Sequence, residues 1–164
     1  MLQVLSAILG GGMSSRLFTE VRERRGLAYY VYGLNHSYTD AGSLYAQAGV
    51  DINRIDDAVS TVATELRKVA DEPIPTAELE KAKSFSKGRF VLQLETSQGL
   101  IMFGLRREVL ESRTPDPDEI LTEIDKVTAE DVGRVAGDLI EKQGLNLAVI
   151  GPFDDPDRFE KLLS

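Results

Sequence analysis

The chain has 164 residues, of which 42% are hydrophobic and 28% charged, and this composition is that of a folded globular protein rather than of a disordered, collagen-like or membrane-embedded one. A net charge of −8 repels phosphate backbones and so disfavours nucleic acid as a partner. The absence of cysteine removes disulfides, thiolate zinc sites and cysteine nucleophiles, and the single histidine, His36, cannot form a site that needs two imidazoles.

The first residues predict two helices separated by a glycine turn. Apolar residues within Val4–Leu9 recur at helical spacing and stop at the run Gly10–Gly12. A second helix begins after a cap at Ser14 or Ser15 and ends at Gly26, with three arginines in its last turn. Because cations suit the negative end of a helix dipole, part of this basic cluster has a purely local explanation.

The next stretch predicts an antiparallel hairpin followed by a helix. Leu27–Tyr38 is rich in β-branched and aromatic residues, and Ser43–Val50 alternates between apolar and polar positions. After this hairpin, Asn53 begins an amphipathic helix that runs to Val69, and Asp56 completes a capping box at its start.

The rest of the chain predicts mostly helices. The expected elements are a helix capped by Thr76 with a break near Thr96, helices over Leu100–Val109, Asp116–Lys126 and Thr128–Leu139, a strand over Leu145–Ile150 and a helix over Pro156–Leu163. These elements predict an α+β fold, a mainly antiparallel sheet with helices packed on one face, in a single domain over residues 1–164. No apolar run approaches the roughly 20 residues of a membrane span and no targeting signal is visible, which favours the cytoplasm and leaves the compartment open.

Three common site patterns are incomplete in this sequence. The glycine run lacks the lysine of a phosphate-binding loop and follows a helix rather than a strand. The string "GMSSR" lacks the second glycine of a nucleophile elbow. His36 lies near Ser37 and Asp40, but neighbouring strand residues point to opposite faces, so a solvent-facing or hydrogen-bonded histidine is favoured over a hydrolase triad.

Arg22 and Tyr29 form a more promising pair. Gly26 turns the chain between the helix that carries Arg22 and the strand that carries Tyr29, so the two polar ends can converge. A guanidinium and a phenol side by side are donors that can hold a peptide carbonyl or an oxyanion. The alternative is a solvated arginine beside a core tyrosine.

Four strings carry a family resemblance. "LGGGMSSRLFTEVRERRGLAYYVYG", followed in order by "PTAELEKAK", "VTAEDVGRVA" and "LAVIGP", resembles the C-terminal half-domain of the pitrilysin/insulinase zinc metallopeptidases, in the processing-peptidase-like branch. The resemblance covers nearly the whole chain, and "MSSRLF..VRE.RGLAY" is its specific part. It implies one half of a clamshell enzyme, in which two similar α+β halves enclose a chamber.

The resemblance also implies roles for particular residues. Zinc is held in the other half through an inverted H-x-x-E-H motif that this chain lacks, so the complete enzyme would contain zinc and this chain would bind no metal. Arg22 and Tyr29 match the arginine and tyrosine that hold the substrate near the scissile bond, which makes them the catalytic candidates. Gly10, Gly11 and Gly12 match the place where a non-catalytic relative carries an extended glycine-rich substrate loop, which is shortened here, and they are the substrate-binding candidates.

A further implication concerns the sheet. The half-domain of this family begins with a strand that precedes "LQVLSAIL", and we expect the fold of residues 1–164 to lack it. An open sheet edge of this kind invites pairing with another strand.

Two main hypotheses follow. In the first, the chain is the substrate-binding half of a zinc-dependent metalloendopeptidase that hydrolyses peptides or presequence-like segments, with a peptide substrate and an N-terminal zinc-bearing half-domain or subunit as partners, and neither nucleic acid nor membrane. In the second, it is a non-catalytic peptidase homologue that acts as a partner subunit or peptide-binding module. An unrelated α+β binding domain remains as a third interpretation. An H-x-x-E-H motif upstream would favour the first.

Overall fold

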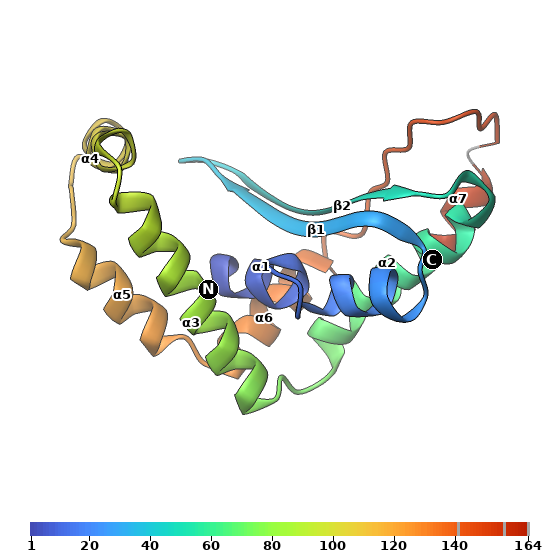
Figure 1. Ribbon diagram of the computed structural model, residues 1–164, viewed down its shortest axis with the longest axis horizontal. Helices are drawn as coiled ribbons and strands as arrows, with labels where there is room; N and C mark the ends of the chain where they lie inside the picture. Colours follow the sequence, from blue (N-terminus) through green and yellow to red (C-terminus); the bar gives the residue numbers. More distant parts are fainter. Residues whose placement is uncertain (141, 156, 164) are drawn as a thin grey trace.

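The computed structural model describes residues 1–140, 142–155 and 157–163 (Figure 1). Its elements in chain order are α1 (Leu2–Gly10), the π-helix η1 (Phe18–Arg24), β1 (Ala28–Ser37), β2 (Gly42–Val50), the 3-10 turn η2 (Ile52–Arg54), α2 (Ile55–Asp71), α3 (Thr76–Leu94), α4 (Ser97–Glu111), α5 (Pro117–Lys126), α6 (Ala129–Ile140) and α7 (Asp157–Leu163). None of these described helices combines the length and hydropathy that a membrane span needs.

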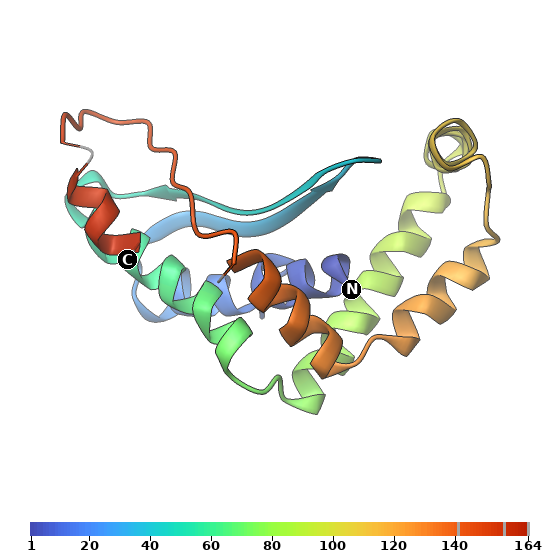
Figure 2. The ribbon, with the colours of Figure 1, turned by 180° about the vertical axis from the view of Figure 1, so that it is seen from behind.

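The strands form one antiparallel hairpin that lies across α1 and α2, with α6 beneath them (Figures 1 and 2). Helices α3, α4 and α5 form an arm at the end of the molecule where the hairpin has its tip. Helices therefore cover one face of the sheet, as the α+β prediction requires, and the opposite face is left open. In the described residues the sheet has two strands.

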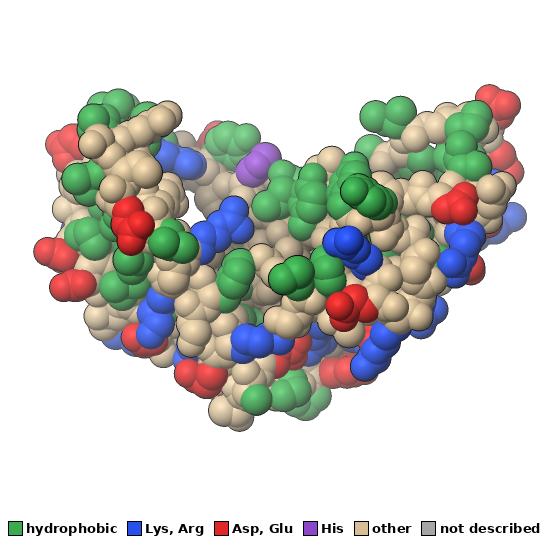
Figure 3. Space-filling view, in the orientation of Figure 1, with side chains coloured by type: hydrophobic (Ala, Val, Ile, Leu, Met, Phe, Trp, Pro, Cys, Tyr) green, Lys and Arg blue, Asp and Glu red, His purple; other side chains and the backbone are tan. Residues whose placement is uncertain are grey.

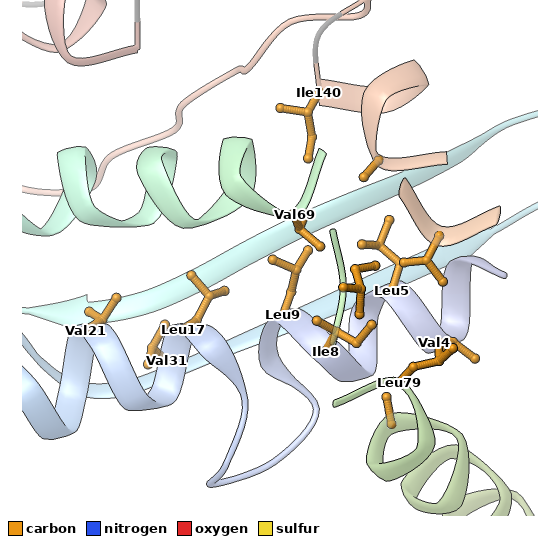
Figure 4. Close-up of a cluster of buried hydrophobic side chains, with 14 of the residues drawn as sticks. Val4, Leu5, Ile8, Leu9, Leu17, Val21, Val31, Val69, Leu79 and Ile140 are labelled. Carbon is orange, nitrogen blue, oxygen red and sulfur yellow. The ribbon is translucent and has the colours of Figure 1, made fainter. Parts of the chain in front are cut away.

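One cluster of buried side chains joins α1 to the sheet and to the neighbouring helices. Val4, Leu5, Ile8 and Leu9 repeat at a spacing of four residues, which turns a broad apolar side of α1 inward. Figure 4 shows these side chains gathered with others of the cluster, among them Val69 of α2 and Ile140 of α6. Because Ser6 and Gly10 of α1 contact Gly33, α1 fixes where the middle of β1 lies.

The predicted strand over Leu145–Ile150 is wrong. This segment forms no strand, although Leu145 packs on the main core and Val149 on a smaller cluster around Phe159. An apolar run becomes a strand only where a neighbouring strand offers backbone partners, and this segment has none in the described part of the chain. The helix predicted from Pro156 is present as α7, but Pro156 itself lies outside the described residues.

Several predicted caps are also wrong. The Ser15 hydroxyl donates to the Gly12 carbonyl (2.6 Å) instead of capping a helix, and α3 has Pro75 rather than Thr76 at its cap position. The expected capping box of Asn53 and Asp56 does not form, because Asn53 donates its N–H to Asp51 (2.9 Å) in the turn before α2. The Asp56 carboxylate instead accepts hydrogen bonds from Arg158 of α7. Local bonds replace the predicted caps at Ser15 and Asn53, and a long-range contact replaces the predicted one at Asp56.

The other caps are confirmed. Asp116 accepts from the N–H of Asp118 (2.9 Å) at the start of α5, ahead of Pro117. Thr128 and Asp131 satisfy each other's backbone N–H groups at the start of α6, and these bonds lower the pKa of Asp131 below its usual value. The break near Thr96 is present as well, since α3 ends at Leu94 and Thr96 caps α4.

Candidate functional site

The chain reverses direction between η1 and β1. Gly26 has a φ of +58°, a left-handed conformation that favours glycine, and its N–H donates to the Arg22 carbonyl (3.1 Å). The Leu27 N–H then donates to the Val21 carbonyl (2.8 Å), so the start of the strand is hydrogen-bonded to the π-helix. Helical turns of the π type are rare and occur often at functional sites. This tight connection holds the last turn of η1 against the beginning of β1.

Tyr29 lies in a β-bulge at the start of β1. Ala28 pairs with Val50 and Tyr30 with Gly49, so Tyr29 has no partner across the sheet. A bulge bends the strand and redirects the side chain of the extra residue. The Tyr29 side chain is 85% exposed, which rules out the alternative of a core tyrosine.

Arg22 lies beside Tyr29 on the surface. Its guanidinium carbon is 6.0 Å from the centroid of the Tyr29 ring and 4.9 Å from that of Phe18, one helical turn earlier. Both distances allow cation–π attraction, which orients the guanidinium without using its N–H groups. Within the described residues the guanidinium has no ion pair or hydrogen bond, and the Tyr29 hydroxyl has none either. Two unused donors are therefore presented together.

Phe18 is a neighbour of Arg22 that the sequence did not indicate as a site residue. Its position four residues before Arg22 is the signal that could have found it, because side chains at that spacing lie on one side of a helix. Phe18 gives Arg22 a second aromatic ring, so the guanidinium contacts η1 as well as β1.

The open face of the hairpin carries a row of aromatic side chains. Tyr30 and Tyr32 are stacked with ring centroids 5.6 Å apart, and His36 lies 5.1 Å from Tyr45 on β2. Figure 3 shows this apolar and aromatic surface over the hairpin. The sequence indicated the tyrosines of β1 but not Tyr45, because only the strand register places it near His36.

His36 is not part of a catalytic triad in the described residues. Its Nε2 is 3.2 Å from the Tyr45 hydroxyl, and no described contact joins its ring to Ser37 or Asp40. This agrees with the prediction of a hydrogen-bonded strand histidine.

Of the three glycines, Gly10 packs against the sheet, and Gly11 and Gly12 lie beside α3. Gly10 is buried against β1, where a Cβ would lie 1.8 Å from the Gly33 nitrogen, so this contact requires glycine. At Gly11 and Gly12 a Cβ would lie 2.9 and 3.4 Å from the Phe85 ring of α3. No described contact joins these glycines to Arg22 or Tyr29, so the structure does not bring the two sets of predicted site residues together.

The position of η1 depends on a contact with α3. Arg16, just before η1, donates from Nε and Nη2 to the two carboxylate oxygens of Glu78 (2.9 and 2.7 Å). This two-point hydrogen bonding raises the pKa of the Arg16 guanidinium above its usual value. The described residues contain no group of three or more His, Asp or Glu suited to holding a metal ion.

Several known proteins are similar to this chain in sequence. Residues 1–85, just over half of the chain, match the family model described as the peptidase M16 inactive domain. An uncharacterized zinc protease of Streptomyces coelicolor is 38% identical over 152 residues, which are 93% of this chain and 33% of that protein. An uncharacterized zinc protease of Bacillus subtilis is 36% identical over 149 residues, or 91% of this chain and 36% of that protein.

A solved structure has a similar fold. A chain in the structure of complex III2 from Candida albicans superposes with a TM-score of 0.77 at 18% identity, over 98% of this chain and 42% of that chain. Identity this low shows the fold alone. The chain spans about a third of the length of the curated relatives it matches. From the matched residues 1–85, this chain belongs to the peptidase M16 family, as its inactive C-terminal domain.

Proposed function

We propose that residues 1–164 form the substrate-clamping half of a zinc metalloendopeptidase that hydrolyses peptides or presequence-like segments. The observation that carries this proposal is the pair of unused donors on Arg22 and Tyr29, exposed beside the open face of the sheet. Membership of the M16 family and relatives named zinc proteases support it.

Zinc belongs to the other half of the proposed enzyme. The described residues offer no cluster of metal ligands and the sequence has a single histidine, so the residues of this chain do not fit a zinc site. The partner of this chain is accordingly a zinc-bearing N-terminal half-domain or subunit.

The work of this half is to hold the substrate backbone. The Arg22 guanidinium donates to a substrate carbonyl and offsets negative charge that develops there, while the Tyr29 hydroxyl donates to the same carbonyl or to the tetrahedral oxygen. Donors that act where charge develops each contribute about 2 to 4 kcal/mol to the transition state. The aromatic row on β1 and β2 gives the peptide an apolar wall next to these donors.

The glycine loop has a supporting role in this proposal. Gly10 is buried, and its lack of a side chain lets α1 approach β1 closely. Gly11 and Gly12 are more exposed than Gly10, and we assign them to contact with the substrate chain.

Mixing experiments test the proposal. The chain by itself should show no peptidase activity, and activity should appear when it is combined with a zinc-bearing N-terminal half. In that mixture, Arg22→Ala and Tyr29→Phe should each lower turnover of a fluorogenic peptide about a hundredfold to a thousandfold.

Two variants serve as matched controls. Arg25→Ala removes an exposed arginine from the same turn, and Tyr38→Phe removes an exposed tyrosine hydroxyl at the hairpin tip. Both should leave turnover unchanged. If Arg22→Ala and Tyr29→Phe left turnover within a factor of a few, the clamping role would be wrong.

The second candidate is a non-catalytic subunit or peptide-binding module. It is favoured by the description of the matching family model as an inactive domain. Under this alternative no zinc-bearing half restores peptide cleavage, while peptide binding to the chain still depends on Arg22 and Tyr29.

A further inference from the structure

Half of the candidate clamp lies on a stretch of chain that has no buried residue of its own. Val21 and Leu27 are 0% and 1% exposed and anchor the two ends of this stretch, but all of residues 22–26 between them are exposed. The stretch carries Arg22 and contains Gly26 with its positive φ. Burial in the core therefore does not fix where Arg22 lies.

Tyr29, the other half of the candidate clamp, is held from both sides. Ala28, just before it, is buried and pairs with β2. Tyr30, just after it, pairs with Gly49. A Cβ at Gly49 would lie 2.4 Å from the Tyr30 ring, so this ring lies over the glycine. The residue whose position still has to be fixed is consequently Arg22 rather than Tyr29.

Arg54 holds the exposed stretch from a different element. It ends the short turn η2, immediately before α2, and its Nη1 donates to the carbonyls of Arg25 and Gly26 (3.1 and 3.4 Å). Its Nε lies 3.9 Å from a carboxylate oxygen of Asp57, in the first turn of α2. A cation beside the carbonyl end of a helix also interacts favourably with the helix dipole. Arg54 thus ties the end of η1 to the start of α2.

The two carbonyls that Arg54 contacts belong to the peptide units that fold back onto η1. The Arg25 carbonyl and the Gly26 N–H form one planar unit, and this N–H donates to the Arg22 carbonyl (3.1 Å). The Gly26 carbonyl and the Leu27 N–H form the next unit, and this N–H donates to the preceding carbonyl of η1 (2.8 Å). Each unit is therefore held at its oxygen by the guanidinium and at its nitrogen by η1.

We propose that Arg54 is a positioning residue for the clamp. It fixes the backbone of Arg22 and so sets where the Arg22 guanidinium meets the substrate beside the Tyr29 hydroxyl. Three observations carry this inference: an exposed stretch that holds Arg22, a guanidinium bonded to both carbonyls of its turn, and a strand that already fixes Tyr29. The inference rests on the proposed function, because Arg54 acts on the substrate only through Arg22.

Loss of this contact should weaken the transition state more than it weakens substrate binding. Without Arg54 the carbonyls of Arg25 and Gly26 bond to water, and the exposed turn gains freedom to move. A catalytic donor displaced by about 1 Å can cost about a hundredfold in rate. The substrate would still contact Tyr29 and the aromatic row on β1 and β2, so its binding before the chemical step is largely kept.

Turnover of a fluorogenic peptide by this chain mixed with a zinc-bearing N-terminal half tests the inference. Arg54→Ala should lower kcat about tenfold and change KM by less than about twofold. Arg54→Lys keeps the positive charge and a donor, and should restore kcat to within about threefold of the unsubstituted chain. Combined with Arg22→Ala, Arg54→Ala should have no further effect, whereas combined with Tyr29→Phe its effect should remain.

Arg106 provides a matched control at the other end of β1. It lies on α4, in the wall of a hollow of about 910 Å³ between the hairpin tip and the helical arm, together with Arg89 and Arg107. Its Nη2 donates to the Ser37 carbonyl (2.7 Å). Arg106→Ala removes the same kind of contact, an arginine bonded to a main-chain carbonyl, at the end of the strand opposite the clamp. It should leave kcat and KM unchanged.

Amide hydrogen exchange of this chain gives a readout that involves neither zinc nor cleavage. Arg54→Ala should speed exchange of the Gly26 and Leu27 amides about tenfold, because both peptide units lose the partner at their oxygen. The amides of β1 beyond Tyr30 and the midpoint of urea unfolding should stay unchanged. A general loss of stability would instead speed exchange throughout the hairpin.

Three outcomes would overturn the inference. They are unchanged exchange at the two turn amides, an equal loss of kcat with and without the Arg22 side chain, or a loss from Arg106→Ala as large as that from Arg54→Ala. Amide exchange does not depend on the partner half, so the inference stays testable even where the mixture is inactive. If Arg22→Ala leaves turnover unchanged, the proposed function fails; if only Arg54→Ala does so, the positioning role alone fails.

Discussion

Helices α1 and α4 both have apolar sequences and lie in opposite environments. Six of the nine residues of α1 are buried, whereas none of the fifteen residues of α4 is. Ile101, Leu105 and Val109, on one side of α4, are 63%, 55% and 68% exposed. Phe103 of α4 lies with its ring 5.5 Å from that of Phe90 on α3, and Arg106 of α4 donates to the Ser37 carbonyl (2.7 Å).

The comparison shows that an apolar helix can either form part of the core or leave an exposed apolar patch. In α1 the apolar side is covered within this chain, so its burial contributes directly to the stability of the domain. In α4 the same kind of residue leaves an exposed patch, which contributes little to folding and which soluble monomers rarely show. Substitutions in the two helices should therefore have unequal effects.

The largest effect is expected from Leu5→Ala in α1. Leu5 is completely buried in the main cluster, so its truncation leaves a cavity and should lower the free energy of unfolding by about 2 to 5 kcal/mol. Urea denaturation followed by circular dichroism measures the loss. A change below about 1 kcal/mol would mean that α1 is not the centre of the fold.

Replacing a glycine by alanine should lower the stability of the chain in α1 and raise it in α4. At Gly10 an added Cβ would meet the backbone of Gly33, so Gly10→Ala should destabilise by about 1 to 3 kcal/mol. At Gly104 in α4 there is open space, and Gly104→Ala should stabilise by about 0.5 to 1 kcal/mol through helix propensity. Thermal unfolding of both variants checks the signs. If both substitutions changed the stability in the same direction, the proposed difference in packing between α1 and α4 would be wrong.

The cap of α6 should matter less than the core beneath it. Thr128→Ala removes the hydroxyl that accepts from the Asp131 N–H, and such caps contribute about 1 kcal/mol. Chemical denaturation at neutral pH measures this loss. Thr122→Ala, whose exposed hydroxyl donates to the Asp118 carbonyl within α5, is a matched control and should cost less.

The same cap predicts a pH dependence. The folded chain lowers the pKa of Asp131, so this carboxylate stabilises the fold above its ordinary pKa of about 3.9, and the contribution is lost as the pH falls through the lower, folded value. The unfolding free energy should therefore decline in acid less steeply for Asp131→Asn than for the unsubstituted chain. An unchanged acid limb would contradict the proposed cap energetics.

The smallest effect is expected on the outer side of α4. Leu105→Ser should change the stability of this chain by less than about 0.5 kcal/mol, because the side chain is already in water. The measurement is the same denaturation assay, with Leu5→Ala as the reference. A loss comparable to that of Leu5→Ala would show that α4 is covered in solution.

Part of the candidate site could be predicted from local sequence. Gly26 marks the reversal that brings η1 and β1 together, and that reversal was enough to pair Arg22 with Tyr29. What it could not give is the orientation, in which the guanidinium lies against the rings of Tyr29 and Phe18. That orientation depends on a π-helix and a bulge, and neither follows from the propensities of the residues that form them.

Other features were beyond the reach of the sequence. The pairing of His36 with Tyr45 follows from the strand register, and the pairing of Asp56 with Arg158 follows from the packing of α7 on α2. The hollow between the hairpin tip and the arm formed by α3, α4 and α5 follows from how that arm is placed. Each involves residues far apart in the chain. Residue propensities and spacing give information only about residues that are close together in the sequence.

By itself the sequence determined the periodic helices, the hairpin, the caps at Asp116 and Thr128, and the motif that identifies the family, because these depend on residues within a few positions of one another. The tertiary structure alone decided that α1 is buried and α4 exposed, that Leu145–Ile150 remains unpaired, and that one edge of β1 opens into a charged hollow. Burial and strand pairing require a partner surface, and where that surface lies is set by the packing of the whole chain.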